Sequence, residues 1–207
     1  MMIDPKGYIL TNAHILKGNR AIVINSNKKE FRANVMLKIE STDLVILKIN
    51  DTDYISPKSP FPINIRPIKV KLGEDVFALT NVFGKDLVFA KGYVGCTSGF
   101  NNDTNYYQID MSAFPGNSGS PVFDKNGNII GLLSYKQKSI ESISYSLKNK
   151  QIFDIIKQLQ NNQKSDSLNV LDIPPLKIQL PKNNAIRPEI TKQISIFEPY
   201  IFAVKAY

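Results

Sequence analysis

Three residues of this chain are candidates for a chemical role: a histidine, an aspartate and a serine, which occur in that order along the sequence. The serine, Ser118, lies in the run Gly116-Asn117-Ser118-Gly119-Ser120-Pro121, and His14 is the only histidine. A serine between glycines is typical of a tight turn, where its hydroxyl projects and nearby backbone N–H groups can face outward. That geometry suits a nucleophile beside an oxyanion hole.

A serine hydroxyl is a weak nucleophile at neutral pH, so a base must take its proton as it attacks. An imidazole suits this task, and a carboxylate can hold the imidazole in one tautomer and stabilise the imidazolium. Taken singly, a histidine at a strand end, an aspartate before a strand and a serine in a polar turn are each often structural. Together, in this order and each at a strand edge, His14, Asp43 and Ser118 predict nucleophilic catalysis.

The elements that must position these residues are short apolar runs separated by turn residues, up to about residue 150. This spacing predicts antiparallel strands of a barrel or sandwich. The proline-rich stretch 56–62 predicts a connection between two lobes, and apolar residues at helical spacing over 151–159 predict an amphipathic helix. After Asn161 the polar and proline-rich composition predicts an extended tail with a strand near residues 200–205.

Composition excludes several classes of function. The formal net charge is +8, but the lysines are scattered and no nucleic-acid motif is present, so we expect no nucleic-acid partner. Cys96 is the only cysteine, which leaves no intramolecular disulfide and no multi-cysteine metal site. We expect no metal and no cofactor. No signal peptide is visible in the first residues.

Three segments of this sequence resemble the triad motifs of trypsin-like peptidases, and most of all the bacterial HtrA-like (Deg) branch. They are residues 8–14 (YILTNAH), 42–48 (TDLVILK) and 115–121 (PGNSGSP). Residues 128–134 resemble the strand that follows the nucleophile, and residues 143–147 resemble the last barrel strand. The similarity runs from about Asp4 to Leu159.

The resemblance implies an all-β, chymotrypsin-like fold of two perpendicular six-stranded antiparallel β-barrels, with one C-terminal helix. The peptidase domain would be residues 1–160, with lobe one at about 1–55, lobe two at about 66–150 and the helix at about 150–160; residues 161–207 would be the tail. The implied site lies between the barrels. Its catalytic residues would be His14, Asp43 and Ser118, its oxyanion hole the N–H groups of Gly116 and Ser118, and its specificity pocket Ser112, Ser134 and Ile143.

The sequence also departs from the family pattern. Ser120 replaces a glycine that is usual in the HtrA-like motif, and no PDZ module follows the peptidase region. The first barrel lacks about a strand and a half at its N-terminal side, which would expose an edge beside the strand that carries His14. Two explanations compete: either the sequence starts at an internal methionine of a longer protein, or the C-terminal strand at 201–205 returns to fill this vacant edge.

The sequence therefore predicts a serine endopeptidase that works through an acyl-enzyme on protein or peptide substrates. Because none of the expected pocket residues is charged, it predicts a preference for small or medium apolar residues before the cleaved bond. The alternative is a catalytically inactive peptide-binding module or an N-terminally truncated peptidase fragment. The resemblance favours the bacterial envelope or the outside of the cell, and the oligomeric state is left open.

Overall fold

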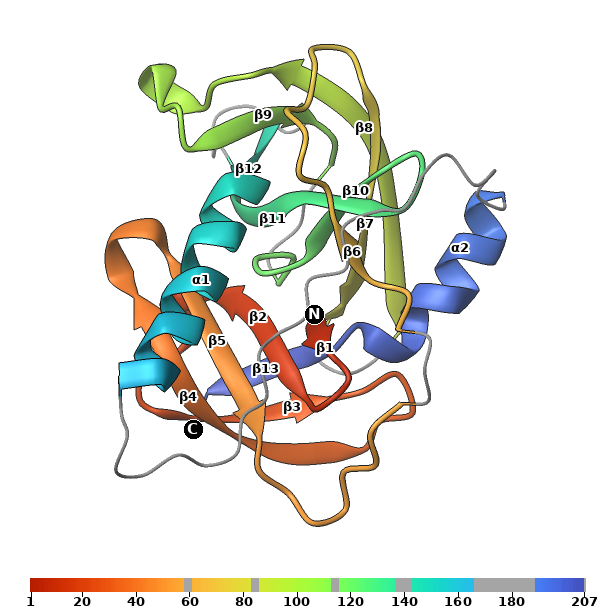
Figure 1. Cartoon of the computed structure of the whole chain (residues 1–207). Helices are drawn as coiled ribbons and strands as arrows, with labels where there is room; N and C mark the ends of the chain where they lie inside the picture. Colours follow the sequence, from red (N-terminus) through yellow and green to blue (C-terminus); the bar gives the residue numbers. More distant parts are fainter. Residues whose placement is uncertain (58–60, 83–85, 113–115, 137–142, 166–188, 207) are drawn as a thin grey trace.

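The computed structural model of this chain describes residues 1–57, 61–82, 86–112, 116–136, 143–165 and 189–206. Within these ranges every strand belongs to one of two sheets, each curled around an apolar interior (Figure 1). The proline-rich connection at 56–62 lies between the two sheets in sequence, and its residues 58–60 fall outside the described residues. The all-β prediction with two barrel-like lobes is confirmed.

The first sheet has six strands in the order β1-β2-β5-β4-β3-β13. Their bounds are β1 Met2–Asp4, β2 Tyr8–Asn12, β3 Arg20–Ile24, β4 Glu30–Ile39, β5 Leu44–Ile49 and β13 Ala203–Ala206. All of its neighbouring strands pair antiparallel, and a bulge between Val35 and Leu37 bends the long strand β4. The central strands β2 and β5 lie next to each other, so their ends bring two distant parts of the chain together.

The second sheet forms a closed barrel of six strands with one more strand added at its side. Its order is β10-β7-β8-β9-β12-β11-β6, and β10 also pairs with β11, which closes the barrel. The bounds are β6 Asn64–Ile65, β7 Asp75–Asn81, β8 Leu87–Cys96, β9 Tyr106–Asp110, β10 Pro121–Asp124, β11 Asn128–Lys136 and β12 Ile143–Lys148. Short strand β6 joins β11 in parallel, while the other pairs are antiparallel.

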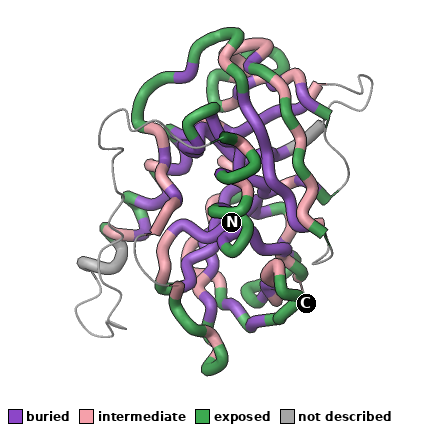
Figure 2. Tube along the Cα trace, turned by 90° about the vertical axis from the view of Figure 1, so that its right-hand side faces the viewer, coloured by how far each residue is buried: buried purple, intermediate pink, exposed green. Residues whose placement is uncertain are grey.

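Burial explains why the apolar runs of the sequence form the centre of each sheet. Every residue of β2 is buried, and β5 is buried except at Lys48. The trace in Figure 2 is accordingly purple along the inner strands and green at many of the connecting turns. At about 1.5–3 kcal/mol for each fully buried aliphatic side chain, these runs supply much of the driving force for folding.

Helix α1, Asn149–Ser165, follows the second barrel and confirms the helix that the sequence predicts at about 150–160. Its apolar side chains at helical spacing, Ile152, Ile155, Ile156 and Leu159, are all at most 3% exposed. They belong to the same buried cluster as strands of the first sheet and residues of the second barrel. The helix therefore packs both lobes onto one core, as its position beside β4, β11 and β12 illustrates (Figure 1).

The C-terminal part differs from the predicted extended tail. Residues 166–188 lie outside the described residues, but Ile190–Phe197 form helix α2, and a 3-10 turn at Glu198–Tyr200 (η5) leads into β13. The interpretation of the whole segment as extended was therefore wrong for residues 190–200. Helix α2 forms because its apolar side contacts the second barrel, a tertiary effect that local composition does not reveal.

The predicted terminal strand is present, and it joins the first sheet. It borders β3, however, with Ala203 opposite Ile24 and Ala206 opposite Ala21. Strand β2, which precedes His14, is bordered by β1 and β5 instead. The expectation that the terminal strand lies directly beside the strand carrying His14 was therefore wrong.

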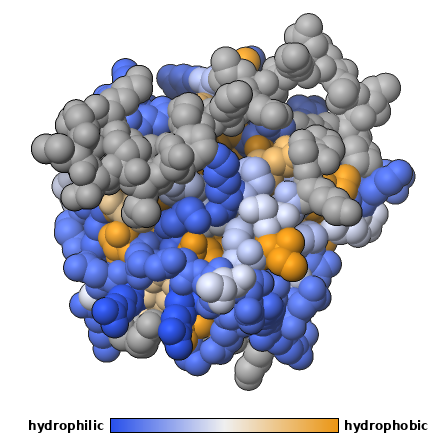
Figure 3. Space-filling model, turned by 60° about the horizontal axis from the view of Figure 1, so that its bottom comes forward, coloured by the Kyte–Doolittle hydropathy of each residue, from blue (hydrophilic) through white to orange (hydrophobic). Residues whose placement is uncertain are grey.

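The face of the molecule in Figure 3 is mainly hydrophilic, with hydrophobic residues scattered between polar ones. Such isolated apolar residues are ordinary on a protein surface. Among the described residues, no helix combines the length and apolar character needed to cross a bilayer.

Candidate active site

His14 and Asp43 are brought together where β2 and β5 end side by side. The Nδ1 atom of His14 lies 2.8 Å from Oδ2 of Asp43, and the backbone N–H of His14 donates to Oδ1 of the same carboxylate at 2.9 Å. Because an ionised carboxylate only accepts hydrogen bonds, this contact places the ring proton on Nδ1. Nε2 is then left as the acceptor, which is the tautomer that a general base needs.

The backbone around Asp43 fixes this geometry. The carbonyl oxygen of Asp43 accepts hydrogen bonds from the N–H of Ala13 at 3.1 Å and from Nδ2 of Asn12 at 3.0 Å. Asp43 ends the 3-10 turn η2 (Glu40–Thr42) in the left-handed region, with φ of 53° and ψ of 40°. Aspartate is one of the few non-glycine residues that tolerate this conformation. The turn thus directs the carboxylate back over the start of the histidine turn η1, Ala13–Ile15.

Ser118 lies on the turn before β10, held by glycines as its motif predicts. Gly116 and Gly119 have φ of 98° and 81°, values that L side chains rarely adopt. The N–H of Gly119 donates to the carbonyl of Leu133 at 2.7 Å, which fastens the turn to β11. A Cβ at Gly119 would lie 2.1 Å from Oγ1 of Thr11, so this glycine also lets the two sheets approach each other.

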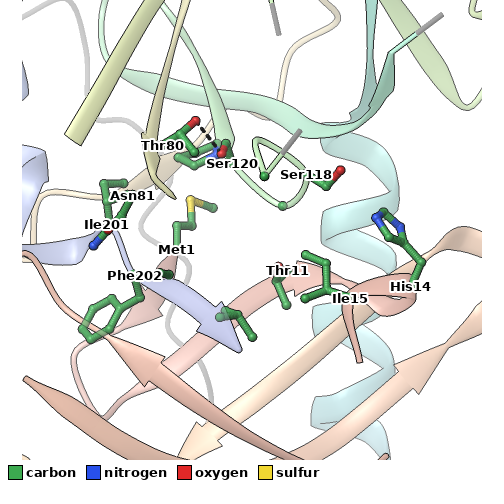
Figure 4. A pocket seen from close by; sticks show the side chains of 15 residues that line it. Met1, Thr11, His14, Ile15, Thr80, Asn81, Ser118, Ser120, Ile201 and Phe202 are labelled. Atoms are coloured by element: carbon green, nitrogen blue, oxygen red, sulfur yellow. Dashed lines mark hydrogen bonds between the residues drawn. The ribbon is translucent and has the colours of Figure 1, made fainter. Parts of the chain in front are cut away.

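Ser120, which stands where the HtrA-like motif usually has glycine, is 5% exposed and has a hydroxyl partner. Its Oγ lies 2.7 Å from Oγ1 of Thr80, as the dashed line in Figure 4 marks. The extra hydroxyl is therefore satisfied inside the protein, and burial of an unpaired polar group is avoided.

The hydroxyl of Ser118 donates to the carbonyl oxygen of Ser134 at 3.0 Å. Among the hydrogen bonds of the described residues, none joins Ser118 to His14. Hydrogen bonds between nucleophile and base are often loose in ligand-free enzymes and tighten when substrate binds. In Figure 4 the imidazole of His14 and the hydroxyl of Ser118 lie at the same end of the site.

The expected oxyanion hole is exposed at this turn. Within the described part of the chain, no hydrogen bond uses the N–H of Gly116 or of Ser118. Gly116 is exposed, while Asn117 between them is buried. Residues 113–115, which complete the motif, fall outside the described residues.

His14 and Ser118 line one pocket of ≈ 230 Å³ between the two sheets. Figure 4 shows this pocket with the candidate base and nucleophile at one end and the C-terminal strand at the other. The remaining lining residues come from both lobes and from the C-terminal segment: Met1, Thr11, Ile15, Thr80, Asn81, Gly116, Gly119, Ser120, Pro121, Ile201, Phe202, Ala203 and Val204.

None of the three expected specificity residues lines this pocket. Ser134 is 3% exposed, and its hydroxyl donates to Oδ2 of Asp43 at 2.8 Å. Its side chain therefore belongs to the hydrogen-bond system of the histidine and aspartate. Ser112 is exposed at the end of β9, and Ile143 is half-buried at the start of β12. Their role in specificity stays a prediction.

Two residues near the site were not singled out from the sequence. Asn12 directly precedes the histidine turn, and its amide anchors the Asp43 carbonyl, so its position next to the histidine motif was the available signal. Tyr106, at the start of β9, lies close to Ser134 and Asp43. Burial raises the pKa of its phenol, the hydrogen bond with Ser134 lowers it and the charge of Asp43 raises it. Tyr106 is therefore neutral at physiological pH, and nothing in its sequence context indicated this place.

No group of three or more histidine, cysteine, aspartate or glutamate residues that could hold a metal ion is found in the described parts of the chain. Among the pocket and triad residues described above, His14 and Asp43 are the two with acidic or basic side chains. Their arrangement can accept a proton from a hydroxyl and hold it on an imidazole paired with a carboxylate.

Comparison with known proteins finds curated relatives that are similar in sequence and a solved structure that is similar in fold. A curated protein of Marinomonas sp. (strain MWYL1), named probable periplasmic serine endoprotease DegP-like, is 29% identical and matches 79% of this chain and 35% of its own length. A protein of the same name from Pseudomonas savastanoi pv. phaseolicola is 32% identical, over 79% of this chain and 34% of its own length. The chain thus spans about a third of the length of these relatives.

A crystal structure of the serine endoprotease from Yersinia pestis superposes with a TM-score of 0.64 at 25% identity, covering 77% of this chain and 56% of that chain. The model of the family described as trypsin-like peptidase domain matches residues 1–132, which include the strands and turns that carry His14, Asp43 and Ser118. With this match, the two-lobed sheet architecture and the named relatives, the chain belongs to the trypsin-like peptidase family.

Proposed function

We propose that this chain is a serine endopeptidase that hydrolyses peptide bonds through an acyl-enzyme. Ser118 attacks the scissile carbonyl, His14 takes the hydroxyl proton and passes it to the leaving amine, and Asp43 orients His14. The N–H groups of Gly116 and Ser118 stabilise the oxyanion. The observation that carries this proposal is the contact of 2.8 Å between Nδ1 of His14 and the Asp43 carboxylate, in a pocket that Ser118 also lines.

A rotation of the Ser118 side chain is the one change that this mechanism requires of the observed structure. The Ser118 hydroxyl donates to Ser134 in this structure, and turning about its Cα–Cβ bond moves Oγ to another staggered position. Rotamer changes of this kind are fast compared with turnover, so the observed partner does not prevent attack. Asn12, Tyr106 and the side chain of Ser134 then act in positioning, since they contact Asp43 or each other, while the Ser134 carbonyl holds the Ser118 hydroxyl in its observed rotamer.

Turnover of peptide substrates by single variants tests this proposal. We expect Ser118→Ala to lower kcat by about a millionfold, as removal of the nucleophile does in other triads. Ser98→Ala, which removes a hydroxyl whose partner is Cys96 and which lies outside the pocket, serves as the matched control and should keep wild-type activity. Hydrolysis by Ser118→Ala at the wild-type rate would contradict the proposal.

The second candidate is a peptide-binding module without hydrolytic activity. The observation that favours it is the Ser118 hydroxyl bound to Ser134 and not to His14 in this structure. The two candidates differ in one measurable way, because a binding module retains an unmodified peptide whereas a peptidase releases two fragments. Mass spectrometry of a peptide mixture after incubation separates them.

A further inference from the structure

The C-terminal residues 190–206, named here the return segment, are fastened to both lobes. The ring of Phe197 in α2 stacks on Phe123 of the second barrel, with centroids 4.8 Å apart and planes 1° from parallel. Nε2 of Gln193 donates to the carbonyl of Lys125 at 3.0 Å. At its other end, β13 pairs with β3 of the first sheet. The residues between these attachments therefore cross from one lobe to the other at a fixed place.

That place is the pocket of His14 and Ser118. Ile201, Phe202, Ala203 and Val204 all line it, and the first three are at most 8% exposed. Figure 4 shows the ribbon of β13 at the end of the pocket away from His14. The return segment is thus one wall of a pocket whose opposite end holds the proposed nucleophile and base.

The chemistry at Ser118 decides which part of a substrate this pocket receives. A peptide at a serine nucleophile lies with its acyl half on one side of the hydroxyl and its leaving half on the other. The expected acyl-side residues Ser112, Ser134 and Ile143 are absent from the lining of this pocket. The base that protonates the leaving amine, His14, is part of it. The pocket therefore lies on the leaving-group side.

We propose that the return segment forms the binding site for the side chain that follows the cleaved bond, and that this site selects a medium-sized apolar residue. The inference rests on the proposed peptidase function. The volume of ≈ 230 Å³ is below the roughly 300–1,000 Å³ of pockets for drug-sized ligands, so it suits one side chain rather than a longer piece of substrate.

The lining explains the apolar selection. Met1, Ile15, Ile201, Phe202 and Val204 supply carbon surface, and the hydroxyls of Thr80 and Ser120 satisfy each other. Apart from His14, no charged side chain is among the lining residues that the structure describes. A charged residue of the substrate would lose its hydration here and find no opposite charge, only neutral polar groups such as the Asn81 amide, whereas valine, leucine or isoleucine would bury apolar surface.

Peptides that differ only in the residue after the cleaved bond test this inference. Two libraries carry mixed apolar residues before the bond and either leucine or lysine after it, and kcat/KM is measured for both. We expect the wild-type chain to prefer leucine at least tenfold. In Val204→Asp the new carboxylate faces the pocket, so the leucine-to-lysine ratio should fall at least tenfold.

The matched control is Lys205→Asp, one residue further along the same strand. Successive side chains of a strand point to opposite faces, and Lys205 is exposed and does not line the pocket. We expect it to keep the wild-type ratio. If Val204→Asp does not fold, Val204→Phe, which narrows the pocket, should shift preference from leucine to alanine at least tenfold.

The outcomes separate this inference from the function on which it rests. Labelling of Ser118 by a fluorophosphonate reports the function and needs no residue after a cleaved bond. Suppose that the wild-type chain is labelled, but the Val204 variants and Lys205→Asp all have the same leucine-to-lysine ratio. That result contradicts the inference and leaves the proposed function standing. A folded wild-type chain that is neither labelled nor hydrolytic removes the proposed function, and the inference with it.

Discussion

At the scale of single residues, the candidate site depends on a glycine that lets the two lobes approach each other as much as on the side chains proposed to react. Gly119 follows the proposed nucleophile, and its missing side chain lets Thr11 of the first sheet contact the turn of the second barrel. Its φ of 81° is also one that alanine adopts only under strain. The turn geometry and the contact between lobes therefore depend on the same residue.

We predict that Gly119→Ala lowers kcat/KM for peptides at least a hundredfold, because the added Cβ displaces either Thr11 or the turn that holds Ser118. Peptide hydrolysis and thermal unfolding of the purified variant measure the two effects. Gly18→Ala is the matched control, since a Cβ there has nothing within 4 Å and should change neither. Wild-type activity in Gly119→Ala would show that the contact does not position the nucleophile.

At the scale of elements, a half-buried ion pair joins Arg66, which follows the short strand β6, to the loop before β7. The Nη1 and Nη2 atoms of Arg66 both bind the Glu74 carboxylate, and Nη1 also lies 3.5 Å from Asp124 of β10. The hydrogen bond from Arg66 holds the pKa of Glu74 below its ordinary value. The pair therefore links three neighbouring elements of the second barrel.

We predict that this pair stabilises the protein at neutral pH and ceases to do so in acid. Because the folded-state pKa of Glu74 is lowered, its contribution is present above the unfolded-state pKa and is lost as pH falls through the folded-state value. The melting temperature of Glu74→Gln should therefore lie below that of the wild type at pH 7, and the difference should shrink below about pH 4. Glu30→Gln, at an exposed strand end, should match the wild type at both values. A difference that grows in acid would contradict this assignment.

The aromatic stack of Phe197 on Phe123 is a main attachment of helix α2, and it gives a second prediction at the scale of elements. Phe197 is 2% exposed between Phe123 and the turn at Gly127, whereas its neighbour Ile196 is 40% exposed. Phe197→Ala should lower the free energy of unfolding by about 3–5 kcal/mol, the usual cost of truncating a buried phenylalanine. Ile196→Ala should cost less than about 0.5 kcal/mol. Urea unfolding of both variants measures the contrast, and equal values would mean that α2 is not docked.

The same elements show which parts of the fold could be predicted from the sequence. The strands before His14 and after Asp43 are apolar runs bounded by turns, and α1 has an unambiguous helical spacing, so local pattern was sufficient. The places of Ser118, His14 and Asp43 at the ends of such elements followed from their motifs. Local sequence pattern did not predict helix α2 or the strand that pairs with β13. Helix α2 depends on its contact with Phe123, and β13 on its pairing with β3, and both partners are distant in sequence.

The contacts of Ser134 and Tyr106 were also beyond sequence reasoning. Ser134 is on a strand whose register brings its hydroxyl to Asp43, and no local pattern specifies a register between distant strands. The rotamer of Ser118 is one of several staggered positions, and no local sequence pattern specifies which one the hydroxyl adopts. Sequence pattern therefore identified the candidate catalytic residues, whereas their hydrogen bonds are determined by the tertiary structure.

At the scale of the whole molecule, the two lobes are joined by α1, by the Gly119–Thr11 contact, by the hydrogen bond from Ser134 to Asp43 and by the return segment. The return segment contributes Phe197, Tyr200, Ile201 and Phe202 to the buried cluster that also contains strands of both lobes. The pocket lies between these lobes, so its shape depends on how firmly they are joined.

We predict that deletion of residues 190–207 lowers the melting temperature by at least about 10 °C, since four buried apolar side chains and a paired strand are removed together. Differential scanning calorimetry measures the change. Replacement of the exposed residues Lys192 and Glu198 by alanine within the intact segment is the control and should leave the melting temperature within about 1 °C. An unchanged melting temperature after deletion would mean that the segment does not join the lobes.

Reaction of the purified chain with a fluorophosphonate probe shows whether Ser118, His14 and Asp43 act as one nucleophilic unit. Mass spectrometry of the digested protein locates the adduct. We expect one adduct, on Ser118, which disappears in His14→Ala and in Ser118→Ala while both variants keep the wild-type melting temperature. A folded wild-type chain that remains unlabelled, or labelling of Ser118 that persists at the same rate in His14→Ala, would contradict this expectation.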